Sequence, residues 1–243
     1  MSDKNSLRNY KIGLIILTAL FILLSITVHL FHNYFLFRLL RGIACYTTLV
    51  YLLIAQGRNI QKWVVGFLFF YGASSFSTVW YENGNMASIS MILNFIAFLM
   101  LLWYVIPKIN LKNITKTFTA LFVLMVIVNG YLFIQLIELM REMTLNYTQY
   151  LFMILSAFSG ILLGFLALFY NHFFNSKLSM TFTLLIFLII FAEIFRGIGY
   201  YNLGYSIAFV YLARIFLVLS LYTLVNFSFL DVKNIKNVKA SVS

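Results

Sequence analysis

Apolar residues occur along this chain in long, nearly unbroken runs, and the polar residues gather in the short stretches between them. A helix that rises about 1.5 Å per residue needs about 20 residues to cross the hydrocarbon core of a bilayer. Eight runs are long enough, at residues 11–31, 34–56, 62–81, 86–106, 118–140, 149–171, 178–202 and 205–230. The pattern predicts an all-α integral membrane protein, with a single transmembrane domain of eight helices in residues 1–243.

The composition agrees with this pattern. Hydrophobic residues make up 63% of the chain and charged residues 9%, whereas a soluble domain carries about 25% charged residues. Too little charge is left to cover a globule that faces water. The single cysteine, Cys45, excludes a disulfide framework, and no motif has the spacing of a metal or cofactor site, so we expect neither a metal nor a cofactor.

The basic residues are distributed unequally between alternate loops. Lysines or arginines occur before the first predicted helix, in the loops after the second, fourth and sixth, and in the tail at 231–243, whereas the other four loops contain Arg141 alone. Because loops rich in Lys and Arg stay in the cytoplasm, the sequence predicts cytoplasmic N- and C-termini and a basic cytoplasmic tail. We expect the protein in a bacterial inner membrane. The same distribution accounts for the net charge of +11 without a nucleic-acid partner.

A shift of 120 residues aligns the third and fourth predicted helices with the seventh and eighth. Tyr81 then meets Tyr201, and Gly84 meets Gly204, in two tight outer loops that both lack basic residues. Because four helices return the chain to the same side, such repeats would be parallel four-helix units related by an axis along the membrane normal. The sequence leaves open whether the two halves are true repeats.

Charged side chains lie inside the last two predicted helices. Glu193 and Arg196 occur in the seventh helix and Arg214 in the eighth. Charges at membrane depth are costly and usually face a partner or a water-filled cavity. Counted from the outer end of each helix, Glu193 and Arg214 lie about 12 to 13 Å deep, and Arg41 and Asn94 lie about 10 to 12 Å deep.

These positions define one polar layer in the outer half of the membrane, whereas the inner half of the same helices is almost purely apolar. Ser75 falls in the same layer, and Tyr200 shares a helix face with Glu193 and Arg196. Only a few residues join the last two helices, so these helices must be antiparallel neighbours. We therefore expect Arg214 to reach Glu193.

Two interpretations of this layer remain open. In the first, Glu193 forms a structural salt bridge that fixes helix packing, and Arg38 and Arg41 extend to the surface. In the second, the layer lines an outward-facing cavity whose surplus positive charge holds a phosphate or carboxylate group through arginine forks. The sequence places no second carboxylate at this depth, so any proton chemistry would depend on Glu193 alone.

Four short motifs allow a comparison with a known family of membrane proteins. They are Arg41-Gly42 in the second predicted helix, Gly72-Ala73 in the third, Ala192-Glu193 in the seventh and Tyr222-Thr-Leu-Val-Asn226 in the eighth. Their order resembles the YhhN family, the eight-helix membrane proteins that include the lysoplasmalogenases, where Lys-Pro, Gly-Asp, Ser-Asp and Tyr-x-x-x-Gln stand. The resemblance implies hydrolysis of the vinyl-ether bond of lysoplasmalogens. Ala73 replaces one of the acids on which that activity is thought to depend, so it equally implies a changed substrate or a non-catalytic relative.

Three functions are compatible with the sequence. The first is a YhhN-like protein, surrounded by membrane lipids, that binds a lysolipid-like anionic amphiphile and, as a hydrolase, would use Glu193 as its catalytic residue. Its ligand-binding residues would be Arg41, Arg196, Arg214, Asn94, Ser75 and Tyr200. The second is a small transporter or flippase for an anionic solute, and the third is a non-catalytic membrane subunit or sensor. The sequence predicts no oligomeric state.

Overall fold

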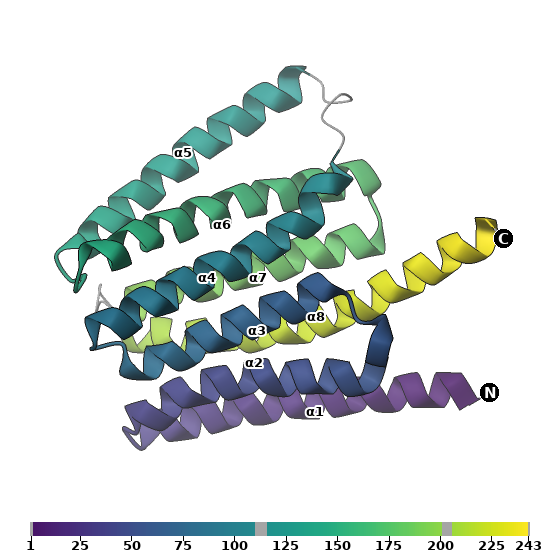
Figure 1. Ribbon diagram of the computed structural model, residues 1–243, viewed down its shortest axis with the longest axis horizontal. Helices are drawn as coiled ribbons and strands as arrows, with labels where there is room; N and C mark the ends of the chain where they lie inside the picture. The colour runs from purple at the N-terminus through teal and green to yellow at the C-terminus, as the bar shows by residue number, and fades with distance from the viewer. Residues whose placement is uncertain (1, 110–115, 201–205, 243) are drawn as a thin grey trace.

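The computed structural model describes residues 2–109, 116–200 and 206–242, and within these ranges the regular structure is entirely helical (Figure 1). The α-helices are α1 (Ser2–Leu30), α2 (Tyr34–Gln56), α3 (Lys62–Ser77), α4 (Gly84–Val105), α5 (Lys116–Arg141), α6 (Tyr147–Phe174), α7 (Lys177–Tyr200) and α8 (Ser206–Val242). Short 3-10 turns follow three of them: η1 (Gly57–Asn59), η2 (Thr78–Trp80) and η3 (Ile106–Lys108). The all-α fold is confirmed.

The helices α2 to α7 lie at the predicted segments, with ends that differ by four residues or fewer. Helices α1 and α8 are longer than expected, because each continues into the polar end of the chain. Neither extension contains a glycine or a proline to end the helix. The residues assigned to a tail, 231–242, therefore continue α8.

Seven helices are long and apolar enough to cross a membrane, judged over the described residues: α1, α2, α3 with η2, α4 with η3, α6, α7 and α8. Their outer faces carry large apolar side chains, and Leu23, Ile54, Trp103 and Met180 are each more than 60% exposed. A soluble monomer rarely exposes so much continuous apolar surface. These features are typical of an integral membrane protein. Helix α5, part of whose side chains lie outside the described residues, is not among the seven.

Asparagine side chains cap the N-termini of three helices at the same end of the bundle. The Oδ1 atoms of Asn33, Asn83 and Asn146 accept hydrogen bonds from the backbone N–H groups of Leu36 (3.0 Å), Asn85 (3.0 Å) and Gln149 (2.8 Å), respectively. Such caps satisfy amide groups that have no partner within the first turn of a helix. In Figure 1 the α1–α2, α3–α4 and α5–α6 turns all lie at the left. The sequence predicts that this end lies on the outer side of the membrane, and we refer to it as the outer end of the bundle.

The helices form a single bundle in which most sequence neighbours, though not α4 and α5, pack side by side. Helices α7 and α8 have the most extensive contact, and α3 packs on both α2 and α4. Non-sequential contacts join α4 to α6 and α8 to both α1 and α2. Helix α5 packs mainly on α6, and Figure 1 shows it outermost at one side of the bundle, opposite α1. Helix α7 therefore lies between α6 and α8.

A close helix contact at Gly42 provides a test of this packing. A methyl group added there would lie 2.7 Å from the ring of Phe76, whereas one added at Gly13 would meet nothing within 4 Å. Alanine favours a helix over glycine at both positions, but overpacking typically costs about 1 to 3 kcal/mol. We expect Gly42→Ala to lower the midpoint of thermal unfolding in detergent, and Gly13→Ala to leave it unchanged or raise it. Equal behaviour of the two variants would contradict the α2–α3 packing.

Candidate functional site

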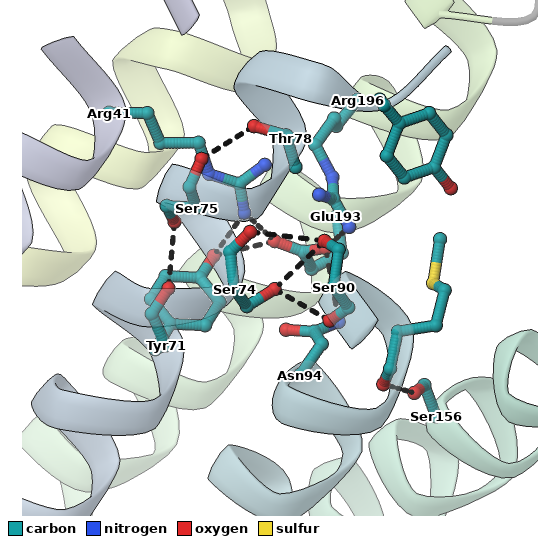
Figure 2. Close-up of polar contacts among 12 residues, drawn as sticks. Arg41, Tyr71, Ser74, Ser75, Thr78, Ser90, Asn94, Ser156, Glu193 and Arg196 are labelled. Atoms are coloured by element: carbon teal, nitrogen blue, oxygen red, sulfur yellow. Dashed lines mark hydrogen bonds and ion pairs between the residues drawn. The ribbon is translucent and has the colours of Figure 1, made fainter. Parts of the chain in front are cut away.

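The carboxylate of Glu193 in α7 lies at the centre of the polar layer (Figure 2). Its Oε1 atom accepts from the guanidinium of Arg41 and from the hydroxyl of Tyr71, at 2.6 Å in the second case. Its Oε2 atom accepts from Arg196 and from the amide of Asn94, at 3.3 Å in the second case. A carboxylate offers about four lone-pair sites, so this one is fully occupied. Glu193 thereby links α7 to α2, α3 and α4.

Two of these donors are fixed by additional contacts. Arg196 follows Glu193 by three residues, which places both side chains on the same face of the helix. Tyr71 is fully buried, stacks on Phe67 with ring centroids 5.1 Å apart, and accepts a hydrogen bond of 3.1 Å from Arg41. The guanidinium of Arg41 also lies 5.3 Å from the centre of the Tyr71 ring. Arg41 is therefore turned into the protein and does not extend to the surface, in contrast to the first interpretation.

The serines of the layer serve helix packing. The hydroxyls of Ser74 and Ser90 each donate to the other residue's backbone carbonyl, at 2.8 and 3.0 Å, and so join α3 to α4. Ser75 donates to the carbonyl of Tyr71 in its own helix, at 2.8 Å. Figure 2 shows these bonds beside Glu193. Ser75, a predicted ligand-binding residue, is fully buried and lines neither of the two cavities described next.

One cavity lies between α4, α5, α6 and α7, and we refer to it as the apolar cavity. The cavity has a volume of about 140 Å³ and is partly open to the surface. Most of its wall consists of apolar side chains, including Met91, Phe98, Phe133, Ile137, Met153 and Ile190. Asn94 and Glu193 supply polar atoms to the same wall.

A second cavity lies between α1, α2, α7 and α8, and we refer to it as the cationic cavity. Its corresponding volume is about 280 Å³, and it too is partly open. Its polar wall is formed by Arg38, Arg41, Arg196, Arg214, His29 and Tyr200. No acidic side chain of the described residues lines it. Arg38, Arg196 and Tyr200 line both cavities and separate them.

Arg214 in α8 does not form the expected contact with Glu193. Its Nη2 atom donates to the backbone carbonyl of Phe37 at 2.6 Å, and its guanidinium lies 4.2 Å from the centre of the Phe37 ring. Arg41, from α2, and Arg196 pair with Glu193 instead. Among the described residues, Arg214 forms no ion pair. It is nevertheless buried, with 6% of its surface exposed.

Arg38 closes the outer end of the layer. It forms an ion pair of 2.6 Å with Glu82, in the turn between α3 and α4, and its guanidinium lies 5.6 Å from the centre of the Tyr200 ring. Partial burial raises the pKa of the Glu82 carboxyl, but hydrogen bonds from Arg38 and from the residue's own backbone lower it below its usual value. The carboxylate is thus held in its charged form and neutralises Arg38.

The layer carries more positive than negative charge. Four arginines line the cationic cavity, and the only carboxylates paired with them in the described part of the chain are Glu82 and Glu193. Four positive charges less two negative charges leave a formal charge of +2. In addition, the Nε atom of Arg41 and the Nη1 atom of Arg214 are buried without a hydrogen-bond partner among the described residues. An unsatisfied buried donor costs about 1 to 3 kcal/mol, and more when it is charged.

The structure brings together most of the residues selected from the sequence. Arg41, Asn94 and Arg196 contact Glu193 directly, Arg214 lies across the cationic cavity, and Tyr200 forms part of the wall between the cavities. Tyr71 was missed, because a tyrosine in an aromatic helix resembles an ordinary core residue. Within the described ranges, no group of three His, Cys, Asp or Glu side chains could hold a metal ion.

A second buried carboxylate lies outside the polar layer, at the opposite end of the bundle. Asp231, one residue beyond the predicted end of the last span, is 3% exposed. It accepts from the hydroxyl of Tyr104 at 3.2 Å and lies 3.8 Å from the ammonium of Lys108, which is itself 3.5 Å from the centre of the Tyr104 ring. This cluster ties α8 to α4 at the inner end of the bundle.

Comparisons of the chain with protein-family models, with curated proteins and with solved structures found no match.

The four-donor arrangement at Glu193 predicts a large stability effect. Removing the charge of Glu193 leaves the buried Arg41 and the partly buried Arg196 without compensation, and breaking a buried pair typically costs about 3 to 5 kcal/mol. We expect Glu193→Gln to lower the free energy of unfolding in detergent by about this amount. The exposed Glu138, whose partner Arg141 lies at 2.9 Å, provides the control, and Glu138→Gln should change stability by less than about 1 kcal/mol.

A double mutant separates pairing from simple loss of a polar group. Arg41→Gln combined with Glu193→Gln removes both charges of one pair, so the double variant should lose less stability than the sum of the two single losses. Strictly additive losses would show that Arg41 and Glu193 are not coupled.

Proposed function

We propose that this protein binds the anionic head group of a membrane amphiphile in the cationic cavity. The observation that carries the proposal is the buried guanidinium of Arg214, which has no carboxylate partner among the described residues and which shares a cavity with three other arginines. A buried charge without compensation is strongly unfavourable. A phosphate or carboxylate group in the cavity would supply both the missing charge and the missing hydrogen-bond acceptors.

The chemistry of the wall favours a group with several charged oxygens. Guanidinium groups bind phosphate and carboxylate through parallel N–H···O bonds. The Nη1 atom of Arg214 and the Nε atom of Arg41 are buried without a partner among the described residues, and both residues line this cavity. A volume of about 280 Å³ is ample for a phosphate group together with a few water molecules.

The surroundings of the cavity favour an amphiphile over a free solute. His29, Tyr34 and Phe37 line its outer part, and Tyr34 is more than half exposed. Aromatic side chains with a polar end are typical of the level at which lipid head groups lie. The cavity also lies between helices with exposed apolar faces. A ligand that reaches it along the membrane surface would keep its hydrocarbon part in an apolar environment.

The arrangement favours binding over hydrolysis by Glu193. All four lone-pair sites of this carboxylate are engaged by donors, and two of these donors carry a full positive charge. A general base needs a free lone pair within reach of a substrate. Ala73, which stands where the YhhN family has an aspartate, lines neither cavity. Kinship with that family, as a relative that binds an anionic lysolipid-like amphiphile without cleaving it, is part of this proposal.

Binding is also favoured over transport. Below the cavities, Phe67, Leu52, Phe182 and Leu224 are almost fully buried and belong to one continuous core. A transport cycle would have to open this core toward the inner side. The cationic cavity, by contrast, reaches the outer end of α1, α2 and α7 without passing through it.

We further propose that the chain crosses a bacterial inner membrane eight times, with both termini in the cytoplasm, because the basic residues alternate between loops as the positive-inside rule requires. Single cysteines at Asn59, after α2, and at Glu142, after α5, should be labelled from opposite sides in intact cells. We expect a membrane-impermeant maleimide to label Glu142→Cys and not Asn59→Cys. The native Cys45 is fully buried, so the wild type is the blank control. Labelling of both positions from outside would refute this topology.

The proposed anion site predicts the effect of replacing Arg214. Glutamine can still donate to the Phe37 carbonyl but carries no charge, so Arg214→Gln should fold. A buried hydrogen bond to a charged group is worth about 1.5 to 3 kcal/mol, which corresponds to a loss of roughly ten- to a hundredfold in affinity. We expect this loss for octyl phosphate, measured by isothermal titration calorimetry on the purified protein.

Two further variants sharpen this test. Arg214→Lys keeps the charge but loses the planar fork, and should bind octyl phosphate with intermediate affinity. Arg141→Gln removes an arginine that lies outside both cavities, and should bind as the wild type does. Unchanged binding by a folded Arg214→Gln variant would overturn the proposed function.

A further inference from the structure

The apolar cavity is elongated along α7. Its wall includes both Tyr200 and Ile190, which are ten residues apart on this helix, so it extends over about 15 Å along the helix axis. Its upper end is polar, with Arg38, Arg196 and Tyr200. Its lower end, formed by Phe98 of α4, Gly160 of α6 and Ile190 of α7, is apolar. A ligand that fits this shape has one polar end and one narrow hydrocarbon part.

The two cavities lie on different faces of α7. At about 100° per residue, Ile190, Ile194 and Gly197 point to one side, and Ala192 and Gly199 to another. Arg196 and Tyr200 lie between these faces and line both cavities. The polar end of the apolar cavity is therefore also a wall of the cationic cavity, and one ligand can place a charged group in one and a chain in the other.

A buried polar atom of a residue in the wall of the apolar cavity also lacks a partner among the described residues. The Oδ1 atom of Asn94 is buried without a hydrogen bond among the described residues, although its Nδ2 atom donates to Glu193. Asn94 is 3% exposed and lines the upper part of this cavity. An acceptor in this position suits a hydroxyl or amide N–H group near the start of a hydrocarbon chain. It has no evident role in helix packing.

From these three features we propose that the apolar cavity holds the single hydrocarbon chain of the anionic amphiphile, and that its lower end, at Gly160, sets the longest chain that fits. The inference rests on the proposed function, because the head group lies in the cationic cavity. The inference adds a second subsite, for the hydrocarbon chain, and an upper limit on the length of that chain. A single narrow chamber accepts one chain, so the ligand class is a one-chain anionic amphiphile.

Gly160 offers a direct way to shorten the chamber. A methyl group added there would lie 3.7 Å from the ring of Phe98, which is an ordinary contact, so Gly160→Ala should be tolerated. A leucine would project beyond this contact into the lower end of the cavity. Ile190→Ala acts in the opposite sense, because it removes side-chain atoms from the same end. The three variants change the length of the chamber and leave every arginine in place.

The experiment is a calorimetric series of n-alkyl phosphates, from butyl to tetradecyl, each below the concentration at which it self-associates. For the wild type, affinity should rise by up to about fourfold per methylene, since each buried methylene is worth about 0.8 kcal/mol, and then level off at a limiting chain length. We expect Gly160→Leu to level off at a shorter chain, Ile190→Ala at a longer one, and Gly160→Ala where the wild type does. Binding of inorganic phosphate should be the same in all four proteins.

The outcomes separate the two proposals. A limiting chain length that stays fixed in both Gly160→Leu and Ile190→Ala would overturn the chain subsite. If the chain subsite is overturned, the proposed function still holds when inorganic phosphate and butyl phosphate bind to the wild type and Arg214→Gln weakens their binding. If neither binds to the wild type, the proposed function itself fails. Should Gly160→Leu fail to fold, a lengthened limit in Ile190→Ala supports the proposal, and an unchanged limit overturns it.

Discussion

The nearly buried carboxylate of Glu193 constrains the rest of this bundle. Removing a carboxylate from water costs several kcal/mol even after the protein relaxes, so the charge must be compensated where it lies. Donors from α2, α3, α4 and α7 do so. None of these helices can move away without breaking an ion pair or a hydrogen bond to Glu193. Helix α8 is then positioned by its long contact with α7, and α1 by α2 and α8.

The layer contains more positive charge than is needed to neutralise Glu193. One carboxylate holds two arginines, and Glu82 neutralises Arg38. Among the described residues, Arg214 contacts only a carbonyl and an aromatic ring through its guanidinium. A carbonyl dipole and a ring quadrupole stabilise a guanidinium less than a carboxylate does. A layer built only to fix helix packing would have no use for the fourth arginine. The surplus is the physical reason for expecting an anionic ligand.

The sequence predicted well which residues share a level along the helices, and predicted poorly which way they point around the helix. Counting residues along straight helices placed Glu193, Arg41 and Asn94 in one layer, and the structure brings them into contact. The count does not say which way a side chain points. Arg214 was therefore assigned to the wrong partner, and Ser75 turns to its own helix. Contacts between non-sequential helices, such as α4 with α6, leave no signal in a single sequence.

The membrane environment determines how the two subsites can act. A chain that comes from a bilayer is already in an apolar medium, so moving it into the apolar cavity gains little from the hydrophobic effect. Affinity in the membrane must then come from the arginines and the head group, whereas the chain contributes through fit. A wall formed at the lower end by Phe98, Gly160 and Ile190 can exclude a long chain without weakening the binding of a short one. Charge and shape thus have separate roles on the two faces of α7.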